Sequence, residues 1–277
     1  MDAGTPRFLI VTTRHLPEAY FLASFLLDRG QRVGLLNLTG RPMPQKLRVL
    51  GRLGHHRGGL YLIDLLLGRA LRRLLLRSTV AVFPEVHPGL VARVRRDTAC
   101  RDCKDLHAAD TLAFVRGLDP HYIVLAGAPI VRPALIGLSR HGTLNRHLGL
   151  APAYRGSDCP LWALACNEPD AVGFTIQFVS EKVDAGDVIV REPVPIAPGL
   201  SLEAYLARVQ RKASEALAGV LDSLIAHRSL PRHGQPAEGR HFPPAGLSTL
   251  RRAARHYASL VHRAPQTVQP RAEVTAA

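Results

Sequence analysis

Three polar side chains of complementary chemistry lie in the central part of the sequence. Asn145 and His147 end an apolar, strand-like run, and Asp184 follows in the turn sequence Val183-Asp184-Ala185-Gly186-Asp187. An amide, an imidazole and a carboxylate that meet at one end of a sheet suit the attack of an amine on a one-carbon acyl group. We therefore expect acyl-transfer chemistry around these residues.

Each of these side chains can take a definite part in that chemistry. Such acyl transfer needs a hydrogen-bond donor for the developing oxyanion and a group that manages the proton that the attacking amine loses. Asn145 and His147 are expected to stabilise the oxyanion, and Asp184 to hold His147. Side chains alternate along an extended segment, so Asn145 and His147 should face one cavity and Arg146 should point away. A carboxylate from another loop can orient the imidazole and favour its charged form. Asp184 is the better candidate, and Asp187 competes as a residue that opens the next strand.

The elements that would position these groups begin with a βαβ unit. Strands are expected at Phe8–Thr13 and Val33–Leu38, with a helix at Leu16–Arg29 between them. Such a unit predicts a right-handed crossover and a parallel sheet. The loop Gly127–Val131 leaves the buried strand Tyr122–Ala126, and open α/β sheets bind ligands at such strand ends. No glycine-rich nucleotide-binding motif follows the first strand.

The remaining hydrophobic patterns fit the same α/β class, a Rossmann-like, mostly parallel open sheet with helices on both faces. The alternation at 172–179 predicts a half-buried strand. Ser157 or Asp158 is expected to cap the next helix, and Ser201 to cap a long one. Further strands are expected at 78–83, 143–144 and 187–196, and helices at 60–77, 108–116, 132–137 and 201–227, with one more that carries Trp162 and Cys166. Residues 87–96 are expected to form a short basic helix or a loop.

Composition limits the class of protein. The 277 residues are 47% hydrophobic, enough for one large domain with or without a small appendage, and the formal charge is +14. This charge favours anionic partners such as phosphates, polyglutamate tails, nucleic acid or acidic membranes. The amphipathic stretch Leu60–Arg77 is either a packing helix with solvated arginines or an attachment to an anionic membrane surface. Because the basic residues are scattered and aromatic residues are 5%, no nucleic-acid partner is expected.

The cysteines and the termini indicate a cytoplasmic protein. Four cysteines are too few for a disulfide scaffold of this size. Cys100 and Cys103, with His107, could supply three ligands to zinc, but reduced thiols in a surface loop explain the pattern too, and no metal is predicted. The N-terminus has no signal-peptide pattern, and no apolar run is long enough for a transmembrane segment.

Two segments are expected in the domain organisation. Residues 1–227 form the catalytic domain, with a Leu- and Arg-rich helical insertion at 43–77. Residues 228–277 form a short basic extension, made of a linker at 231–244, a short helix at 247–261 and a disordered tail from Ala264. The oligomeric state stays open, and a homodimer is one of the allowed states.

An ordered set of short motifs carries a resemblance to a known family. The set is Asn145-x-His147, then LxPxYRG at 150–156, LWAL at 161–164, GxTIxF at 173–178 and VDAGDVI at 183–189. It resembles the 10-formyltetrahydrofolate-dependent formyltransferases, which include glycinamide ribonucleotide transformylase, methionyl-tRNA formyltransferase and the sugar N-formyltransferases. The resemblance covers roughly residues 118–196, and a weaker similarity extends back to Phe8.

The resemblance implies roles for individual residues in the formyltransferase fold. The matching Asn, His and Asp of the family are catalytic, which implies that role for Asn145, His147 and Asp184. Residues implied to hold the folate are Gly127, Pro129, Ile130, Val131, Val183, Ala185 and Asp187. We expect the acceptor to be bound by Thr12, Thr13, Tyr154, Arg155 and Gly156.

The chain also departs from the commonest family pattern. Gly149-Leu-Ala-Pro152 replaces the usual Ser-Leu-Leu-Pro, and an Arg often seen near Pro129 is missing. These departures concern the folate contacts and leave the three catalytic positions intact.

The resemblance implies transfer of a formyl group from 10-formyltetrahydrofolate to a primary amine of a small molecule. An amino sugar or a secondary-metabolite intermediate is expected, because the insertion at 43–77, LWAL at 161–164 and the basic helix near the C-terminus resemble those of formyltransferases that act on such molecules. The residues after His227 are too few and too poor in strands for the C-terminal β-barrel of the tRNA enzymes. The alternatives are a formyl-folate hydrolase and a non-catalytic folate-binding protein of the same fold.

Overall fold

The computed structural model describes residues 7–40, 51, 56–75, 82–180, 184–236 and 238–263. Within these ranges no helix is both long enough and apolar enough to cross a bilayer. The predicted fold class is confirmed, because the main sheet is mostly parallel and helices cover both of its faces.

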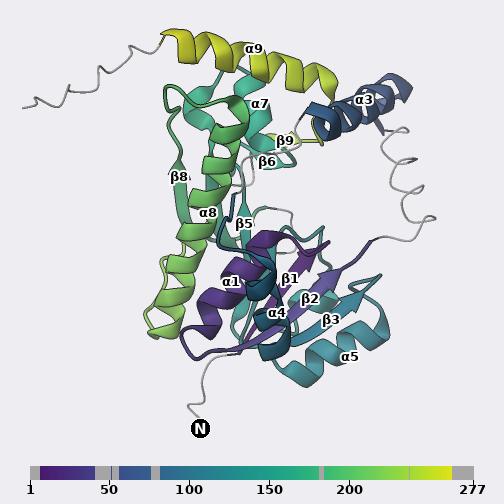
Figure 1. Cartoon of the computed structure of the whole chain (residues 1–277), viewed down its shortest axis with the longest axis vertical. Coiled ribbons are helices and arrows are strands. Elements are labelled where there is room, and N and C mark those ends of the chain that lie inside the picture. The colour runs from purple at the N-terminus through teal and green to yellow at the C-terminus, as the bar shows by residue number, and fades with distance from the viewer. Residues whose placement is uncertain are drawn as a thin grey trace, which may run out of the picture.

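The main sheet has seven strands in the order β3-β2-β1-β4-β5-β7-β8 (Figure 1). The strands from β3 to β5 are parallel, whereas β7 and β8 run antiparallel to their neighbours. A small second sheet pairs β6 with β9. The bounds are β1 Arg7–Thr13, β2 Arg32–Leu38, β3 Ala99–Cys103, β4 Tyr122–Ala126, β5 Gly142–His147, β6 Arg155–Gly156, β7 Gly173–Phe178, β8 Val188–Pro193 and β9 His241–Phe242.

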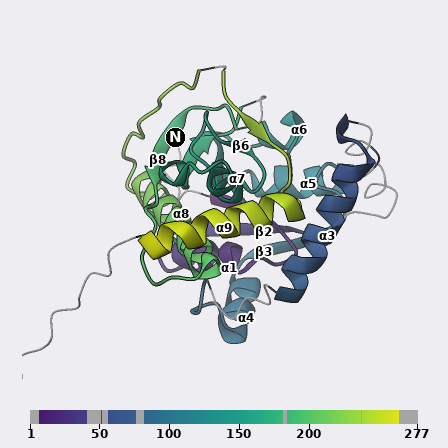
Figure 2. The same ribbon diagram turned by 90° about the horizontal axis from the view of Figure 1, so that it is seen from above.

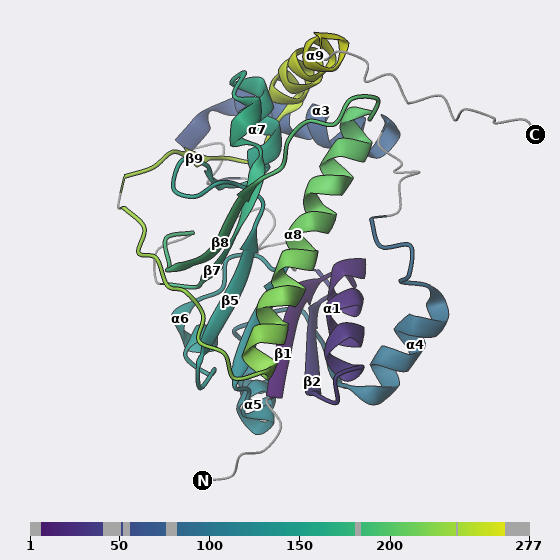
Figure 3. The same cartoon turned by 90° about the vertical axis from the view of Figure 1, so that its left-hand side faces the viewer.

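Helices lie on both faces of this sheet. Figure 3 shows α8 running along the strands beside α1, with the short α6 on the opposite side. The helices are α1 Pro17–Leu27, α3 Gly59–Leu75, α4 Pro88–Asp97, α5 Ala109–Leu118, α6 Pro133–Ile136, α7 Cys159–Ala165, α8 Leu202–Ile225 and α9 Leu247–Arg263, with a 3-10 turn, η1, at Pro169–Ala171.

The alternating side chains of β1 explain why its run Phe8–Val11 is apolar without interruption. Phe8 and Ile10 belong to the core between the sheet and the helices α1 and α8, whereas Leu9 and Val11 belong to the core under α5 and α6. A strand covered on both faces buries every side chain, so no polar alternation is needed.

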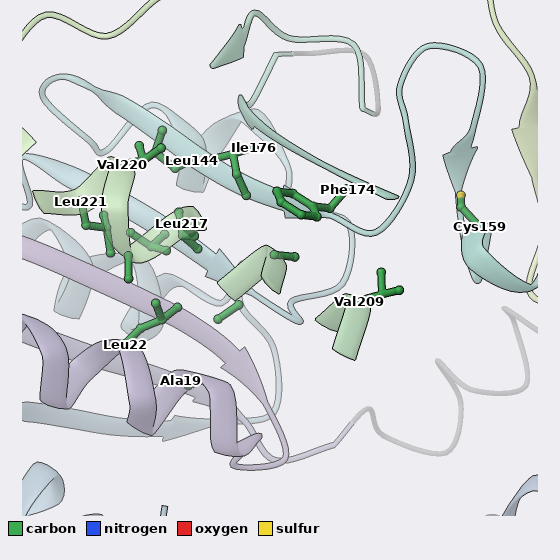
Figure 4. Close-up of a cluster of buried hydrophobic side chains, with 14 of the residues drawn as sticks. Ala19, Leu22, Leu144, Cys159, Phe174, Ile176, Val209, Leu217, Val220 and Leu221 are labelled. Atoms are coloured by element: carbon green, nitrogen blue, oxygen red, sulfur yellow. The ribbon is translucent and has the colours of Figure 1, made fainter. Parts of the chain in front are cut away.

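The long helix α8 supplies much of the larger core. Ser201 caps it as predicted, because its Oγ accepts a hydrogen bond from the Ala204 N–H at 3.1 Å. Figure 4 shows Leu217 and Leu221 pointing between Leu22 of α1 and the strands. Fully burying one leucine side chain contributes about 1.5–3 kcal/mol to folding. The helix therefore holds the site-bearing strands against α1.

A buried ion pair ties β5 to the helices on this face. Arg146 Nη2 donates to Glu18 Oε2 of α1 at 2.5 Å, and Ser214 Oγ of α8 donates to Glu18 Oε1 at 2.8 Å. The side chains of Arg146 and Glu18 are 6% and 0% exposed. Arg146 thus points away from Asn145 and His147, as the alternation predicts. Its charge fixes the register of β5 beneath α1 and α8.

Several local expectations were wrong. The strand β7 is buried at every position rather than half-buried, because the elements on its two sides both cover it. Asp158 takes the N-cap position of α7 without a side-chain capping bond, since its carboxylate accepts the Ala245 N–H instead. The strand that was predicted at 78–83 falls largely outside the described residues.

The helix α9 covers the end of the molecule where α7 and α3 lie (Figure 2). Ala253 and Tyr257 of α9 are buried in the main core. Asp64 of α3 accepts hydrogen bonds from the N–H and the hydroxyl of Ser248 in the first turn of α9. A carboxylate at a helix N-terminus is favourable, so this contact ties α3 to α9.

Replacing Glu18 should test the buried ion pair. We expect Glu18→Gln to lower the free energy of unfolding by about 3–5 kcal/mol, because the Arg146 charge would stay buried without its partner. Asp222→Asn, at the exposed pair of Arg29 and Asp222, should cost no more than about 1 kcal/mol. Urea denaturation of the two variants measures the difference, and equal costs would contradict this account.

Candidate active site

Two members of the predicted trio, Asn145 and His147, lie at the carboxyl end of β5, and Asp184 lies in the turn before β8. Asn145 of β5 is paired with Leu125 of β4 and with Gln177 of β7. All three border a cavity of ≈ 390 Å³. The rest of its wall is formed by Ala128, Pro129, Ile130, Val131, Arg146, His147, Leu148, Gly156, Ser157, Val179, Ser180, Asp184 and His241.

Asp184 is held at this wall by hydrogen-bond donors from three elements. Its Oδ2 accepts the Gly156 N–H at 3.0 Å. Its Oδ1 accepts Asn145 Nδ2 at 3.3 Å and Gln177 Nε2 at 3.4 Å. The Asp184 backbone is left-handed, with φ +52°. This conformation costs energy in a non-glycine residue and persists where neighbouring contacts enforce it.

His147 stands between the Asp184 carboxylate and a main-chain carbonyl. Its Nε2 is 2.7 Å from the Tyr154 carbonyl oxygen, so this nitrogen carries the hydrogen and donates. Its Nδ1 is 3.6 Å from Asp184 Oδ2. Both ring nitrogens therefore face oxygen atoms, which fixes the orientation of the ring. The side chains of His147 and Asp184 are 6% and 10% exposed, so solvent screens their interaction weakly.

A buried thiol completes the surroundings of this imidazole. Cys159 Sγ lies 3.7 Å from His147 Nε2. Burial first, and the Asp184 carboxylate second, raise the pKa of the Cys159 thiol above its ordinary value. The thiol therefore stays protonated at neutral pH and has no nucleophilic role.

Glycine is required at two positions beside the trio. A Cβ on Gly149 would lie 2.5 Å from both His147 Nε2 and the Tyr154 carbonyl oxygen. A Cβ on Gly186 would lie 1.8 Å from the carbonyl oxygen of Phe178. A side chain at either position would displace the imidazole or the turn that carries Asp184. The departure from the family pattern at Gly149 thus has a steric reason in this chain.

The residues expected to hold folate separate into two groups. Pro129, Ile130 and Val131 line the cavity, and Ile130 is 72% exposed there. Gly127 does not line it, but its left-handed backbone, with φ +69°, turns the chain from β4 into this loop.

The second group lies in the Asp184 turn. Ala185 and Asp187 do not border the cavity. The Asp187 carbonyl accepts the Phe178 N–H at 2.9 Å, so Asp187 shapes the turn before β8. Of the two aspartates that were proposed for His147, only Asp184 reaches it. Val183 lies outside the described residues.

The residues expected to bind the acceptor are mostly placed elsewhere. Thr12 is fully buried on the α1 face, and neither it nor Thr13 borders the cavity. The phenol of Tyr154 is buried and donates to Glu168. Arg155 Nε donates to the Asp184 carbonyl oxygen at 3.1 Å, so this side chain supports the turn. Gly156 alone of the five lines the cavity.

Sequence reasoning missed the polar groups around the trio. Gln177 was read only as a polar position of an alternating strand. His241 lines the cavity and Gln235 contacts Gln177, yet both fall in the segment predicted as a linker. A polar, proline-rich composition resembles a linker, and no local pattern signals long-range contacts of this kind.

The Cys-x-x-Cys pattern does not lie in a surface loop, as one expectation had it. Cys100 and Cys103 are free cysteines on β3, and Cys103 is buried. His107 Nε2 accepts the Arg132 N–H at 2.9 Å. Within the described part of the chain, no three His, Cys, Asp or Glu side chains gather in a way that could hold a metal ion.

Comparison with known proteins shows a family that part of this chain resembles. Residues 86–221 match the family model described as "Formyl transferase". Methionyl-tRNA formyltransferase of Chlorobium chlorochromatii is 30% identical over 125 residues, which are 45% of this chain and 38% of that protein. The enzyme of the same name from Moorella thermoacetica is 32% identical over 149 residues, covering 52% and 46%. The matched part of the chain thus spans less than half of these relatives.

Solved structures share the fold at low sequence identity. A sugar N-formyltransferase from Shewanella superposes with a TM-score of 0.57 at 14% identity, covering 92% of this chain and 88% of that one. Phosphoribosylglycinamide formyltransferase from Bacillus halodurans gives a TM-score of 0.54 at 18% identity, covering 79% and 95%. At these identities the likeness concerns the fold.

The contact of Glu168 with Arg240 predicts a pH-dependent stability. Hydrogen bonds from Arg240 and then from Tyr154 lower the pKa of Glu168 to about 2. A carboxyl whose pKa is depressed on folding stabilises the protein above its unfolded pKa, and this contribution is lost as the pH falls toward 2. We expect the stability advantage of the wild type over Glu168→Gln to be constant above about pH 5 and to shrink below pH 4.5. Urea titrations across this range measure it.

Proposed function

Because residues 86–221 belong to the formyl transferase family, we propose that this chain transfers a formyl group from 10-formyltetrahydrofolate to a primary amine. One observation carries the proposal. Asn145, His147 and Asp184 meet on one wall of a cavity whose adjoining wall is the loop after β4. An amide donor, an imidazole and a carboxylate at one ligand site are the groups that formyl transfer needs.

The cavity wall fits a flat aromatic ring such as the pterin of a folate. Pro129, Ile130 and Val131 offer an apolar surface, and the volume of ≈ 390 Å³ lies in the range of small-molecule sites. We propose that this loop holds the pterin and that the Asp184 turn borders it. Bound there, the folate would supply the formyl group on its N10 nitrogen.

In this proposal Asn145 stabilises the charge that develops on the formyl oxygen. Its amide carries two hydrogens, and one is directed to Asp184 Oδ1. The other can point into the cavity toward the formyl oxygen. A donor that is already oriented before the reaction costs no reorganisation when the charge appears.

His147 and Asp184 would manage the proton. The amine attacks while neutral, and it loses one proton as the new C–N bond forms and the bond from the formyl carbon to N10 breaks, while N10 gains a proton. The Asp184 carboxylate is placed to stabilise a positive ring on His147, and the Tyr154 carbonyl keeps the ring oriented. Nδ1 is the ring nitrogen on the Asp184 side, so we assign the mobile proton to it.

We propose that the acceptor is an amino sugar or a related hydroxyl-rich small molecule. Ser157, Ser180 and His241 line the cavity next to the trio. Hydroxyl and imidazole groups can both donate and accept hydrogen bonds, which suits a polyhydroxylated acceptor.

A second candidate acceptor is the amino group of methionyl-tRNA. The curated relatives carry that name, and the formal charge of +14 would favour a polyanion. Among the described residues, the segment after α8 contributes only β9 and α9 as regular elements. We therefore rank this acceptor second.

A screen of amines with 10-formyltetrahydrofolate tests the proposal. Each reaction is read by mass spectrometry for an added formyl group and by absorbance for release of tetrahydrofolate. Nucleotide-linked amino sugars are the expected acceptors. Formylated methionyl-tRNA would support the second candidate, formate without any amine would indicate a hydrolase, and folate binding without turnover would leave a binding protein.

Substitutions in the trio should separate chemistry from folding. We expect Asn145→Ala to lower kcat by about 10²–10³-fold, because one oxyanion donor is removed. Asp184→Asn should lower it by about 10²–10⁴-fold, because the ring proton loses its counter-charge. Steady-state kinetics with circular dichroism as a folding check measure both effects.

Asp187→Asn is the matched control for Asp184→Asn. Asp187 lies three residues further along the same turn and does not border the cavity. Its variant should keep a kcat near that of the wild type. An equal loss in both variants would contradict the assignment of the carboxylate to Asp184.

A further inference from the structure

A segment that follows α8 in the sequence returns to the candidate site. Residues 233–243, which we call the strap and which are described apart from Ala237, begin with His233 paired to Val188 of β8 through hydrogen bonds of 2.8 and 3.0 Å. The strap ends where the Pro243 carbonyl accepts Trp162 Nε1 at 2.7 Å. Between these anchors β9 pairs with β6, and His241 of β9 lines the cavity.

Gln235 is the strap residue that reaches toward the trio. Its Nε2 donates to Gln177 Oε1 at 2.7 Å and to the Gly186 carbonyl oxygen at 2.6 Å. Its Oε1 accepts Arg155 Nη2 at 3.2 Å, and Arg155 also donates to the Asp184 carbonyl oxygen. One side chain therefore contacts β7, the turn that carries Asp184, and the arginine that supports this turn.

These contacts decide which way the Gln177 amide points. Because Gln235 donates to Gln177 Oε1, the Gln177 amide must present its Nε2 hydrogens to Asp184 Oδ1, 3.4 Å away. In the flipped orientation, an amide oxygen would face a carboxylate oxygen, and two acceptors would be in contact. Gln235 of the strap thereby selects one of the two orientations of the Gln177 amide, the one that donates to the Asp184 carboxylate.

We infer that Gln235 is a positioning residue of this active site. It holds the Gln177 amide and the Gly186 carbonyl so that Asp184 keeps its left-handed backbone and its place beside His147. The expected effect on kcat rests on the proposed function. The effect of Gln235 on the position of Asp184 does not depend on it. The strap that carries Gln235 also brings His241 to the cavity wall.

Two substitutions of Gln235, which offer different hydrogen-bonding groups to the Gln177 amide, test the inference. Gln235→Met keeps the length of the side chain and removes its donors, which leaves both orientations of the Gln177 amide open. Gln235→Glu offers only acceptors, so the Gln177 amide must turn its oxygen toward Asp184. We expect kcat to fall about 10–100-fold in Gln235→Met, because the carboxylate is displaced, and further in Gln235→Glu. KM for the amine should change less than threefold.

Glu238→Gln is the matched control, since Glu238 is an exposed residue of the same strap. It should match the wild type in kcat and KM. A strap with a merely structural role would give a different result, in which both Gln235 variants lose thermal stability in proportion to activity and recover kcat at lower temperature. That pattern would overturn the inference.

A measurement that needs no turnover separates this inference from the proposed function. In protein labelled with ¹⁵N-histidine, the Nδ1 resonance of His147 reports the neighbouring carboxylate. We expect Gln235→Glu to move this resonance toward its position in Asp184→Asn, and Glu238→Gln to leave it unchanged. An unmoved resonance overturns the positioning role. If the wild-type protein transfers no formyl group, the proposed function is wrong. The His147 resonance still decides the role of Gln235 in that case.

Discussion

The site depends on one carboxylate that is kept nearly out of water by neutral donors. Asp184 receives hydrogen bonds from the backbone N–H of Gly156 and from the amides of Asn145 and Gln177. An ionised group can be buried only where such donors replace its hydration. The three donors come from β6 of the small sheet and from β5 and β7 of the main sheet, so the carboxylate meets all three only when both sheets are formed.

The opposite face of the sheet carries a second buried charge that supports the first. Arg146 lies between Asn145 and His147 in β5 and is paired with Glu18 under α1 and α8. A shift of one residue in β5 would send this guanidinium toward the cavity and both proposed catalytic groups into the apolar core. The charges of Arg146 and Asp184 lie on opposite faces of the sheet. Each charge therefore disfavours the register of β5 in which the other would be misplaced.

The sheet and the positions of Asn145, His147 and Asp184 could be predicted because they depend on local patterns in the sequence. Period-two alternation placed Asn145 and His147 on one face, and the Val183–Asp187 turn signal located Asp184. The burial of β7 on both faces could not be predicted, because the alternating pattern indicates that Thr175 and Gln177 face solvent. Both side chains are instead buried and form hydrogen bonds within the protein. The places of Thr12 and Tyr154 were missed too, since burial depends on helices that pack from distant parts of the chain.

The segment beyond His227 shows why such features escape a reading of local patterns. Gln235 and His241 lie among prolines, glycines and basic residues, a composition that suits an exposed linker. The strap pairs with backbone groups of β6, β8 and the Asp184 turn, which any sequence could offer, and Gln235 adds contacts to the side chains of Gln177 and Arg155. A segment that is anchored largely through main-chain groups can vary at its other side chains and still dock. Such a segment can change the groups at the mouth of the cavity while leaving Asn145, His147 and Asp184 where the sheet places them. Recognition of the acceptor and the chemistry of transfer would then reside on different parts of the chain, joined at Gln177.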